Sequence, residues 1–204
     1  MPFLGIDLSL SNTGVVVVSG GKIVKSGNVK TKPPAKKSPM EETKRIIKII
    51  NSLEPYLSDD IELVCLEGLS FMARNTTALM QLAGLNYLLR ERILRQTNNN
   101  YFLIENFGSE TAEIDEALGT SRGFVVAAPT QLKKFICGNG RADKDVMMLE
   151  TYKKYNVSLT DNNVCDAFGL ALIAEAVWHE CNKSPLDLAK YQSEVVSMIA
   201  GQLK

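Results

Sequence analysis

Histidine is almost missing from this chain of 204 residues, which has a single one, His179. The four cysteines include no pair in C-x-x-C spacing. A zinc site built from cysteine and histidine, or a Ser-His-Asp triad, needs residues that this chain barely has. His179 lies at the end of a helical pattern, where we expect a surface or capping role. A metal site in this protein must therefore use oxygen ligands, which favours magnesium or manganese.

Long apolar runs are also absent. No stretch is apolar and charge-free enough to span a membrane, and no signal peptide is visible. The cysteines lie in apolar surroundings, so we expect buried free thiols in a reducing compartment. The sequence therefore predicts a cytoplasmic protein with no membrane partner.

The chain has no excess of charge of either sign, because 23 lysines and arginines balance 23 aspartates and glutamates. This argues against a binder that is basic all over, but a local patch is enough to contact nucleic acid. Residues 22–37 hold six lysines and no acid. A solvated strand and loop explain that run as well as a nucleic-acid surface does.

Short apolar segments alternate with helical patterns along the chain. Strands are predicted over 3–8, 14–19, 22–30, 61–68 and 123–129. Helices are predicted over 40–53, 76–95, 130–136, 142–155 and 162–180. This order predicts an α/β fold with a mixed five-stranded sheet, in which a three-strand antiparallel meander joins parallel strands and helices cover both faces. Strand 61–68 must then lie parallel to strand 3–8, which puts Asp7 and Glu67 side by side.

The predicted domain covers 1–182. Within it, the acidic segment 98–121 is expected to be an insertion. Residues 183–204 are expected to form a C-terminal helical extension, whose docking face the pattern does not define. Helix 76–95 carries a stripe of Leu79, Leu82, Ala83, Asn86, Leu89 and Ile93 along one side.

Three acids, Asp7, Glu67 and Asp166, each interrupt an apolar element that should be buried. Each has a structural explanation when taken alone: Asp7 caps a turn, Glu67 ends a strand, and Asp166 favours a helix N-terminus. Together, converging carboxylates in an apolar setting repel one another unless a divalent ion lies between them. Such a set is typical of phosphodiester hydrolysis with two metal ions.

Asn163 lies three residues before Asp166, so a helix puts both side chains on one face. Its amide oxygen is an acceptable magnesium ligand. A helix N-cap is an equally open explanation for Asn163, and also for Asp161 or Asn162.

Four segments carry a resemblance to RuvC-type Holliday-junction resolvases, members of the RNase H-like nuclease superfamily. They are GIDLSLSNTG (5–14), LEGLSFMARNTTALMQLAG (66–84), PTQLKKFICGNGRADKDVMM (129–148) and DNNVCDAFGLALIA (161–174). The resemblance implies an RNase H-like fold. Divergent members of this kind occur in bacteriophages, so it also implies a phage origin and the cytoplasm of a bacterial host.

The resemblance also implies roles for particular residues. Asp7, Glu67, Asn163 and Asp166 would hold two Mg²⁺ ions, with Mn²⁺ able to substitute, and Lys144 would stabilise developing negative charge. Implied DNA contacts are Phe71 stacking on a base, Arg74 and Lys133 on the backbone, and a flexible cationic loop containing Gly138, Gly140 and Arg141. A core phenylalanine at Phe71 and an ordinary surface lysine at Lys144 are the structural alternatives.

The implied activity is Mg²⁺-dependent cutting of four-way DNA junctions by paired symmetric hydrolysis. Two symmetric cuts call for a homodimer. The resemblance implies that helix 76–95 forms the dimer interface. An ordinary place in the core is the alternative explanation for the apolar stripe of this helix. A flap or fork nuclease of the same fold and a junction-binding protein with weakened catalysis remain open. An actin-like ATPase is a third class, which would need a second phosphate loop that we do not see.

Three departures from the family pattern bear on these alternatives. Asn163 stands where the family usually has an acid or a histidine, so one ligand is weaker or Asp161 takes its place. The FMARN segment, 71–75, lies one residue further from Glu67 than the usual spacing. The acidic segment 98–121 is expected to be an insertion that compact members of the family lack.

Overall fold

The computed structural model describes residues 1–36, 38–69, 76–97 and 123–203. Its centre is a five-stranded sheet with the strand order β3-β2-β1-β4-β5. The strands are β1 (Phe3–Asp7), β2 (Asn12–Ser19), β3 (Lys22–Lys30), β4 (Leu63–Glu67) and β5 (Gly123–Ala127). β1, β2 and β3 form an antiparallel meander, and β4 lies parallel to both β1 and β5. The predicted fold class is confirmed, and so is the parallel pairing of the strands that carry Asp7 and Glu67.

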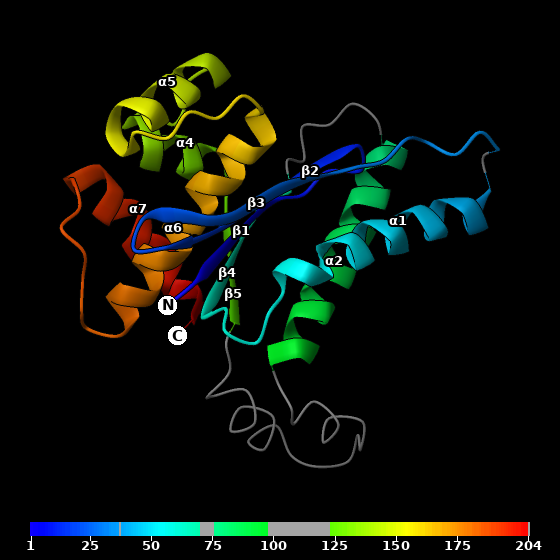
Figure 1. The fold of residues 1–204 in the computed structure, drawn as a ribbon, viewed down its shortest axis with the longest axis horizontal. Coiled ribbons are helices and arrows are strands. Elements are labelled where there is room, and N and C mark those ends of the chain that lie inside the picture. The colour runs from blue at the N-terminus through cyan, green and yellow to red at the C-terminus, as the bar shows by residue number, and fades with distance from the viewer. Residues whose placement is uncertain (37, 70–75, 98–122, 204) are drawn as a thin grey trace, which may run out of the picture.

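Helices cover both faces of this sheet. They are α1 (Pro39–Leu53), α2 (Thr76–Thr97), α4 (Pro129–Cys137), α5 (Lys144–Tyr155), α6 (Asn162–Cys181) and α7 (Lys190–Ala200), with 3-10 turns η1 (Glu54–Tyr56) and η3 (Gly201–Leu203). Figure 1 shows α1 and α2 on one side of the sheet and α4, α5, α6 and α7 on the other. The predicted ranges differ from these bounds mainly at their ends. β2 begins at Asn12 because its polar first residues pair with Lys30 and Val29 of β3.

The two faces of the sheet build two separate cores. Because side chains alternate along a strand, Leu4 and Ile6 of β1 pack in the core under α1 and α2. Phe3 packs in the other core, with α4, α6 and α7. The same alternation directs Asp7 to the face that α6 covers.

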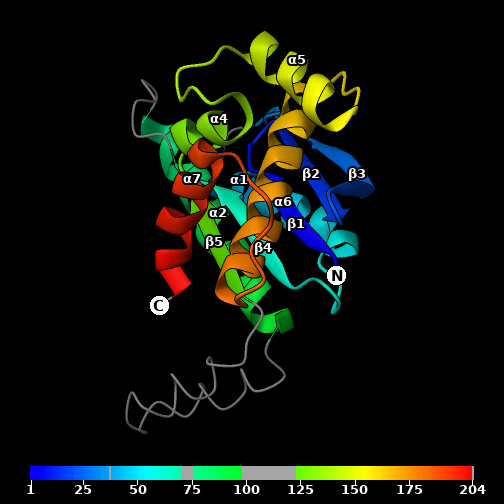
Figure 2. The same ribbon diagram turned by 90° about the vertical axis from the view of Figure 1, so that its left-hand side faces the viewer.

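Helix α6 lies directly on the sheet, as Figure 2 shows from that side. Two glycines make this approach possible. A Cβ atom on Gly5 of β1 would lie 2.0 Å from the carbonyl oxygen of Ala167, and one on Gly14 of β2 would lie 2.0 Å from that of Asn163. No side chain fits in either place, so these two glycines set how closely the first turns of α6 approach β1 and β2.

The C-terminal segment contributes to the core. Val195, Val196 and Ile199 of α7 are buried in the same cluster as the sheet and α6. Lys134 of α4 also forms an ion pair with Glu194 of α7 at 2.7 Å. The docking of this helix, which the sequence pattern did not define, is thus settled, while the domain boundary at 182 stays a prediction.

The cysteine prediction is only partly right. All four thiols are free, and Cys65 and Cys165 are buried, but Cys181 is exposed. Cys181 is the last residue of α6, beyond the part of the helix that packs against the sheet. His179 lies in the last turn of α6 with Nδ1 3.1 Å from the carbonyl oxygen of Ser184, which confirms its predicted place at a helix end. None of the described helices is long and apolar enough to cross a membrane.

The contact between Gly14 and α6 can be tested by adding one methyl group. Gly14→Ala would force that methyl into the backbone of Asn163, so we expect the free energy of unfolding to fall by about 3 kcal/mol or more. Urea denaturation measures the change. Gly201→Ala is the control, since a Cβ atom added there would meet no atom of another part of the protein within 4 Å, and it should change stability by less than about 0.5 kcal/mol. Equal effects of the two substitutions would contradict the close contact.

Candidate active site

The turn that follows β1 is closed by its own polar side chains. Thr13 is buried and donates from Oγ1 to the carbonyl oxygen of Ser9 at 2.7 Å, while Ser9 N–H donates back to Thr13 Oγ1 at 3.1 Å. Ser9 Oγ accepts from the N–H of Ser11 at 3.2 Å. Arg45 of α1 donates to the carbonyl oxygen of Leu10 at 2.6 Å. The turn is therefore held on both sides, and it fixes the end of β1 where Asp7 lies.

Asp7 and Glu67 are the last residues of two neighbouring parallel strands. Ile6 pairs with Leu66 in the register, so the two acids emerge side by side at the same edge. Asp7 is 8% exposed, and its carboxyl group lies so close to that of Glu67 that each affects the pKa of the other. Two carboxylates in such contact must share a proton or a cation.

Asp166, one turn into α6, completes an acid cluster, by which we mean Asp7, Glu67 and Asp166. Burial, followed by the charges of Glu67 and Asp166, raises the pKa of Asp7 to about 8. Burial also raises the pKa of Glu67 and of Asp166 above their ordinary values. The close approach of α6 at Gly14 is what brings Asp166 within electrostatic range of the strand ends, because Gly14 is the register partner of Asp7.

Two lysines oppose these shifts. The charge of Lys144, the first residue of α5, acts to lower the pKa of all three acids against the effect of burial. Lys133 of α4 acts in the same direction on Glu67 and Asp166. Lys144 is exposed and Lys133 is half-buried. The acid cluster therefore faces cationic side chains from two other helices, an arrangement that suits a bound phosphate between acids and lysines.

Asp161 and Asn163 have different tasks at the start of α6. Asp161 is the N-cap, and its carboxylate accepts from the backbone N–H of Asn163 at 2.9 Å and from Asn12 Nδ2 at 3.3 Å. Burial opposes ionisation, but these hydrogen bonds lower the pKa of Asp161 below its ordinary value. The N-cap explanation that was open for three residues thus applies to Asp161.

The side chain of Asn163 is held by β2. Its Nδ2 donates to the carbonyl oxygen of Asn12 at 2.6 Å. This bond leaves the amide oxygen as the side-chain atom available to a ligand. Whether that oxygen binds a metal ion stays a prediction.

The donor atoms of the acid cluster are carboxylate oxygens, which fit Mg²⁺ or Mn²⁺. Within the described ranges, no three Asp, Glu, Cys or His side chains form a group that holds an ion by itself. Asp7 and Glu67, which act most strongly on each other among these acids, would be the first ligands of an ion bound here. Asp166, the Asn163 amide oxygen, water and substrate oxygens are the further donors at hand.

The cationic loop predicted to contact DNA has a structural reason for its glycines. Gly138 ends α4 in the left-handed region, with φ 75°, and its N–H donates to the carbonyl oxygen of Lys134 at 2.8 Å. A Cβ atom on Gly140 would lie 2.9 Å from the carbonyl oxygen of Thr130. Arg141 is exposed beside them. DNA contact by this loop stays a prediction, and Phe71 and Arg74 lie outside the described residues.

The apolar stripe predicted on α2 is core in part: Asn86, Leu89 and Ile93 are buried, and Leu85 joins them. The other members of the predicted stripe are half-buried, namely Leu79, Leu82 and Ala83. A buried polar side chain within it, Asn86, was not predicted to be functional. The only signal was an amide at a position where the helical period requires an apolar residue.

When a chelator keeps metal ions away, the shared proton of the acid cluster should make the free energy of unfolding of this protein depend on pH. Folded Asp7 keeps its proton to about pH 8, whereas the unfolded chain loses it near the ordinary value of 3.8. The folded state holds the extra proton between these values, so its free energy of unfolding falls as the pH rises. Between about pH 5 and about pH 8 we expect a loss of up to about 4 kcal/mol, and a smaller loss in Asp7→Asn. Thermal unfolding at several pH values measures this, with the exposed Asp59→Asn as the control. Parallel profiles for the wild type and Asp7→Asn would contradict it.

Comparison with known proteins finds no matching family model and no matching curated protein. Among solved structures, the chain is similar to Thermus thermophilus RuvC in complex with a Holliday junction substrate, with a TM-score of 0.57 and 16% identity over 90% of this chain and 97% of that one. A second Thermus thermophilus RuvC structure gives a TM-score of 0.55 and 17% identity over 90% and 98%.

A third match is a fowlpox virus resolvase in complex with its substrate Holliday junction DNA, with a TM-score of 0.36 and 14% identity over 84% of this chain and 95% of that one. The phage origin stays a prediction. The two RuvC structures establish that this chain is built on the fold of RuvC, with the α/β architecture that its sequence predicted.

Proposed function

We propose that this protein is a Mg²⁺-dependent endonuclease that cuts four-way DNA junctions. One observation carries the proposal: the buried Asp7 and the half-buried Glu67 and Asp166 lie within electrostatic range of one another at the ends of central strands in a sheet with the RuvC fold, and they face Lys144 and Lys133. Burial of like charges is unfavourable without a cation. A protein that keeps this unfavourable arrangement of acids at the ends of its central strands therefore uses it to bind a cation.

Each side chain has a separate task in this proposal. Asp7 and Glu67 hold the ions between the strand ends, and Asp166 and the Asn163 amide oxygen extend the ligand set from α6. When bound, divalent ions supply an activated water and stabilise the leaving oxygen of a phosphodiester. Lys144 approaches the scissile phosphate from α5 and stabilises the negative charge that develops on it. Lys133 positions the DNA backbone from α4.

A homodimer suits a junction, because two symmetric cuts need two sites related by a two-fold axis. The face of α2 that points away from the core supports this part of the proposal. Met80, Tyr87 and Leu88 lie on it with exposed fractions of 74%, 66% and 46%. An exposed apolar face of this kind is typical of a protein–protein contact. The predicted interface helix thus has an apolar surface besides the stripe that it buries in the core.

Flap or fork cutting by the same site is the nearest alternative, since the choice of substrate depends on dimer geometry. A junction-binding protein with weakened catalysis is the second alternative, and Asn163 is the residue that supports it. Its amide is neutral, whereas an acid at this position would offer a metal ion a negative charge.

The first test is cleavage of an end-labelled four-way junction, beside a flap and a plain duplex, in Mg²⁺. Removing one carboxylate of the central pair should remove the ion, so Asp7→Asn should slow cleavage by more than roughly 100-fold and leave junction binding intact. Gel-shift binding and cleavage are measured on the same preparations. The wild type should give paired symmetric cuts in the junction.

Other outcomes separate the alternatives. Equal cutting of the flap would indicate a general branched-DNA nuclease. Junction binding without cutting, in Mn²⁺ as well as Mg²⁺, would indicate a protein with a disabled site. Unchanged cutting by Asp7→Asn would contradict its place in the ion site.

Lys144 gives a separate prediction. Because its charge acts on all three acids, Lys144→Ala should slow cleavage by roughly 100-fold while weakening junction binding far less. Single-turnover cleavage at saturating protein separates the two effects. Lys48→Ala, on the exposed side of α1, is the matched control and should change neither. Equal losses in binding and cleavage would make Lys144 a simple phosphate contact.

A further inference from the structure

A pocket lies beside the acid cluster, on the other side of the strand ends. It has a volume of about 380 Å³, within the range of small-molecule sites. Its walls are mainly apolar and come from the end of β1, the segment after β4 and the helix α2, with Leu8, Leu69, Leu79 and Leu82 among them. Glu67 is also part of its lining. The pocket and the acid cluster therefore share one residue.

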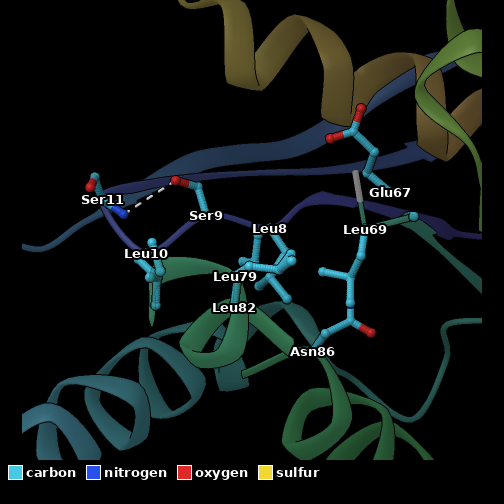
Figure 3. A pocket seen from close by; sticks show the side chains of 11 residues that line it. Leu8, Ser9, Leu10, Ser11, Glu67, Leu69, Leu79, Leu82 and Asn86 are labelled. Carbon is cyan, nitrogen blue, oxygen red and sulfur yellow. Dashed lines mark hydrogen bonds between the residues drawn. The ribbon is translucent and has the colours of Figure 1, made fainter. Parts of the chain in front are cut away.

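Figure 3 shows the side chains that line the pocket, with Glu67 among them. The carboxyl group of Glu67 points toward α6, the gold helix, and so toward the acid cluster. Asn86 rises from α2 on the opposite side, toward Leu69. A substrate that crosses the strand ends at Glu67 can thus contact both sites at once.

Asn86 is the unusual member of the pocket. Its side chain is 1% exposed, and neither its Nδ2 nor its Oδ1 has a hydrogen-bond partner. A buried amide without partners destabilises a fold by roughly 1–3 kcal/mol. An amide that keeps both groups unpaired beside a cavity is therefore ready for a ligand that supplies one acceptor and one donor next to each other.

The lining restricts the chemistry of that ligand. No lysine or arginine is among the described residues of the pocket, and its only charged member is Glu67. The described lining therefore offers no positive charge to a phosphate or another anion. Leucine walls favour a flat apolar ring, and the amide favours a ring edge that carries a donor beside an acceptor. Every nucleobase has such an edge, but A and C present the donor and acceptor in the opposite order from G and T. An asparagine amide that packing holds in one orientation therefore forms two parallel hydrogen bonds with some bases and not with others.

We propose that this pocket binds an unpaired nucleobase of the substrate DNA, next to the scissile phosphate, with Asn86 reading the edge of the base. The inference rests on the proposed function, since it assumes that the phosphate lies on the acid cluster. The base leaves the stack at the branch point, where unstacking and unpairing require least energy. Sequence preference in cutting then comes from Asn86.

The free protein gives the first arm of the test. Asn86→Leu keeps the branched shape and the number of heavy atoms, removes the unpaired amide and has the pocket beside it to take its larger methyl groups, so the midpoint of thermal unfolding should rise by about 2 °C or more. Asn51→Leu is the control for helix propensity, because Asn51 is exposed on α1. A fall in the midpoint for Asn86→Leu would show that the amide stabilises the fold, and that result would overturn the proposal.

Cleavage gives the second arm. Four junctions are compared that differ only in the base next to the cut. The wild type should prefer one base over the poorest by roughly 5- to 100-fold, the range expected of a two-bond contact. Asn86→Leu should cut all four at similar rates, and Asn51→Leu should keep the preference. An unchanged preference in Asn86→Leu, with normal cutting by the wild type, would overturn the base pocket alone.

A binding experiment tests the pocket without requiring cleavage. A junction with 2-aminopurine at that position is bound to Asp7→Asn and to Asp7→Asn/Asn86→Leu. Fluorescence should rise with the first protein, as the base leaves the stack, and rise less with the second. Equal signals in both would overturn the pocket. A wild type that neither cuts nor binds any branched DNA would instead overturn the proposed function, and the pocket with it.

Discussion

The contact between the carboxyl groups of Asp7 and Glu67 is the constraint around which this structure is arranged. Two acids at the ends of adjacent parallel strands repel each other in a buried setting, and only a proton or a cation relieves that repulsion. Burial and the neighbouring acid charges raise the pKa of Asp7 to about 8. In the metal-free protein a shared proton therefore relieves the repulsion between the two acids, and a divalent ion can take the place of that proton.

The rest of the fold brings partners to this pair. Gly5 and Gly14 let α6 lie against the backbone of β1 and β2, so Asp166 comes within range of the strand ends. The hydrogen bonds among Asp161, Asn163 and Asn12 then hold the start of α6 to β2. Lys144 approaches from α5. The same strand ends border the apolar pocket with Asn86, and so a phosphate and a base of one nucleotide could be recognised on opposite sides of Glu67.

The comparison with RuvC bears on the fold, whereas the chemistry depends on the side chains of this chain. At 16% and 17% identity, the backbone path is shared while most side chains differ. Asn86 and Asn163 show why this matters. Both are neutral amides placed among apolar or acidic neighbours, and the role proposed for each depends on its side chain and does not follow from the path of the backbone.

Local pattern was sufficient to predict the strands, most helix ranges and the pairing that joins Asp7 to Glu67, because apolar periodicity and short turns are properties of neighbouring residues. It also predicted that acids interrupting apolar runs would meet. It was not sufficient for the docking of α7 or the exposure of Cys181, since both depend on segments far apart in the chain. It also left the N-cap of α6 open among three neighbouring residues, and only the hydrogen bonds of Asp161 decided it. Asn86 is the clearest case: the sequence shows an amide in an apolar stripe, and only the packing of α2 against the sheet decided that its hydrogen-bonding groups would be buried, unpaired and beside a pocket.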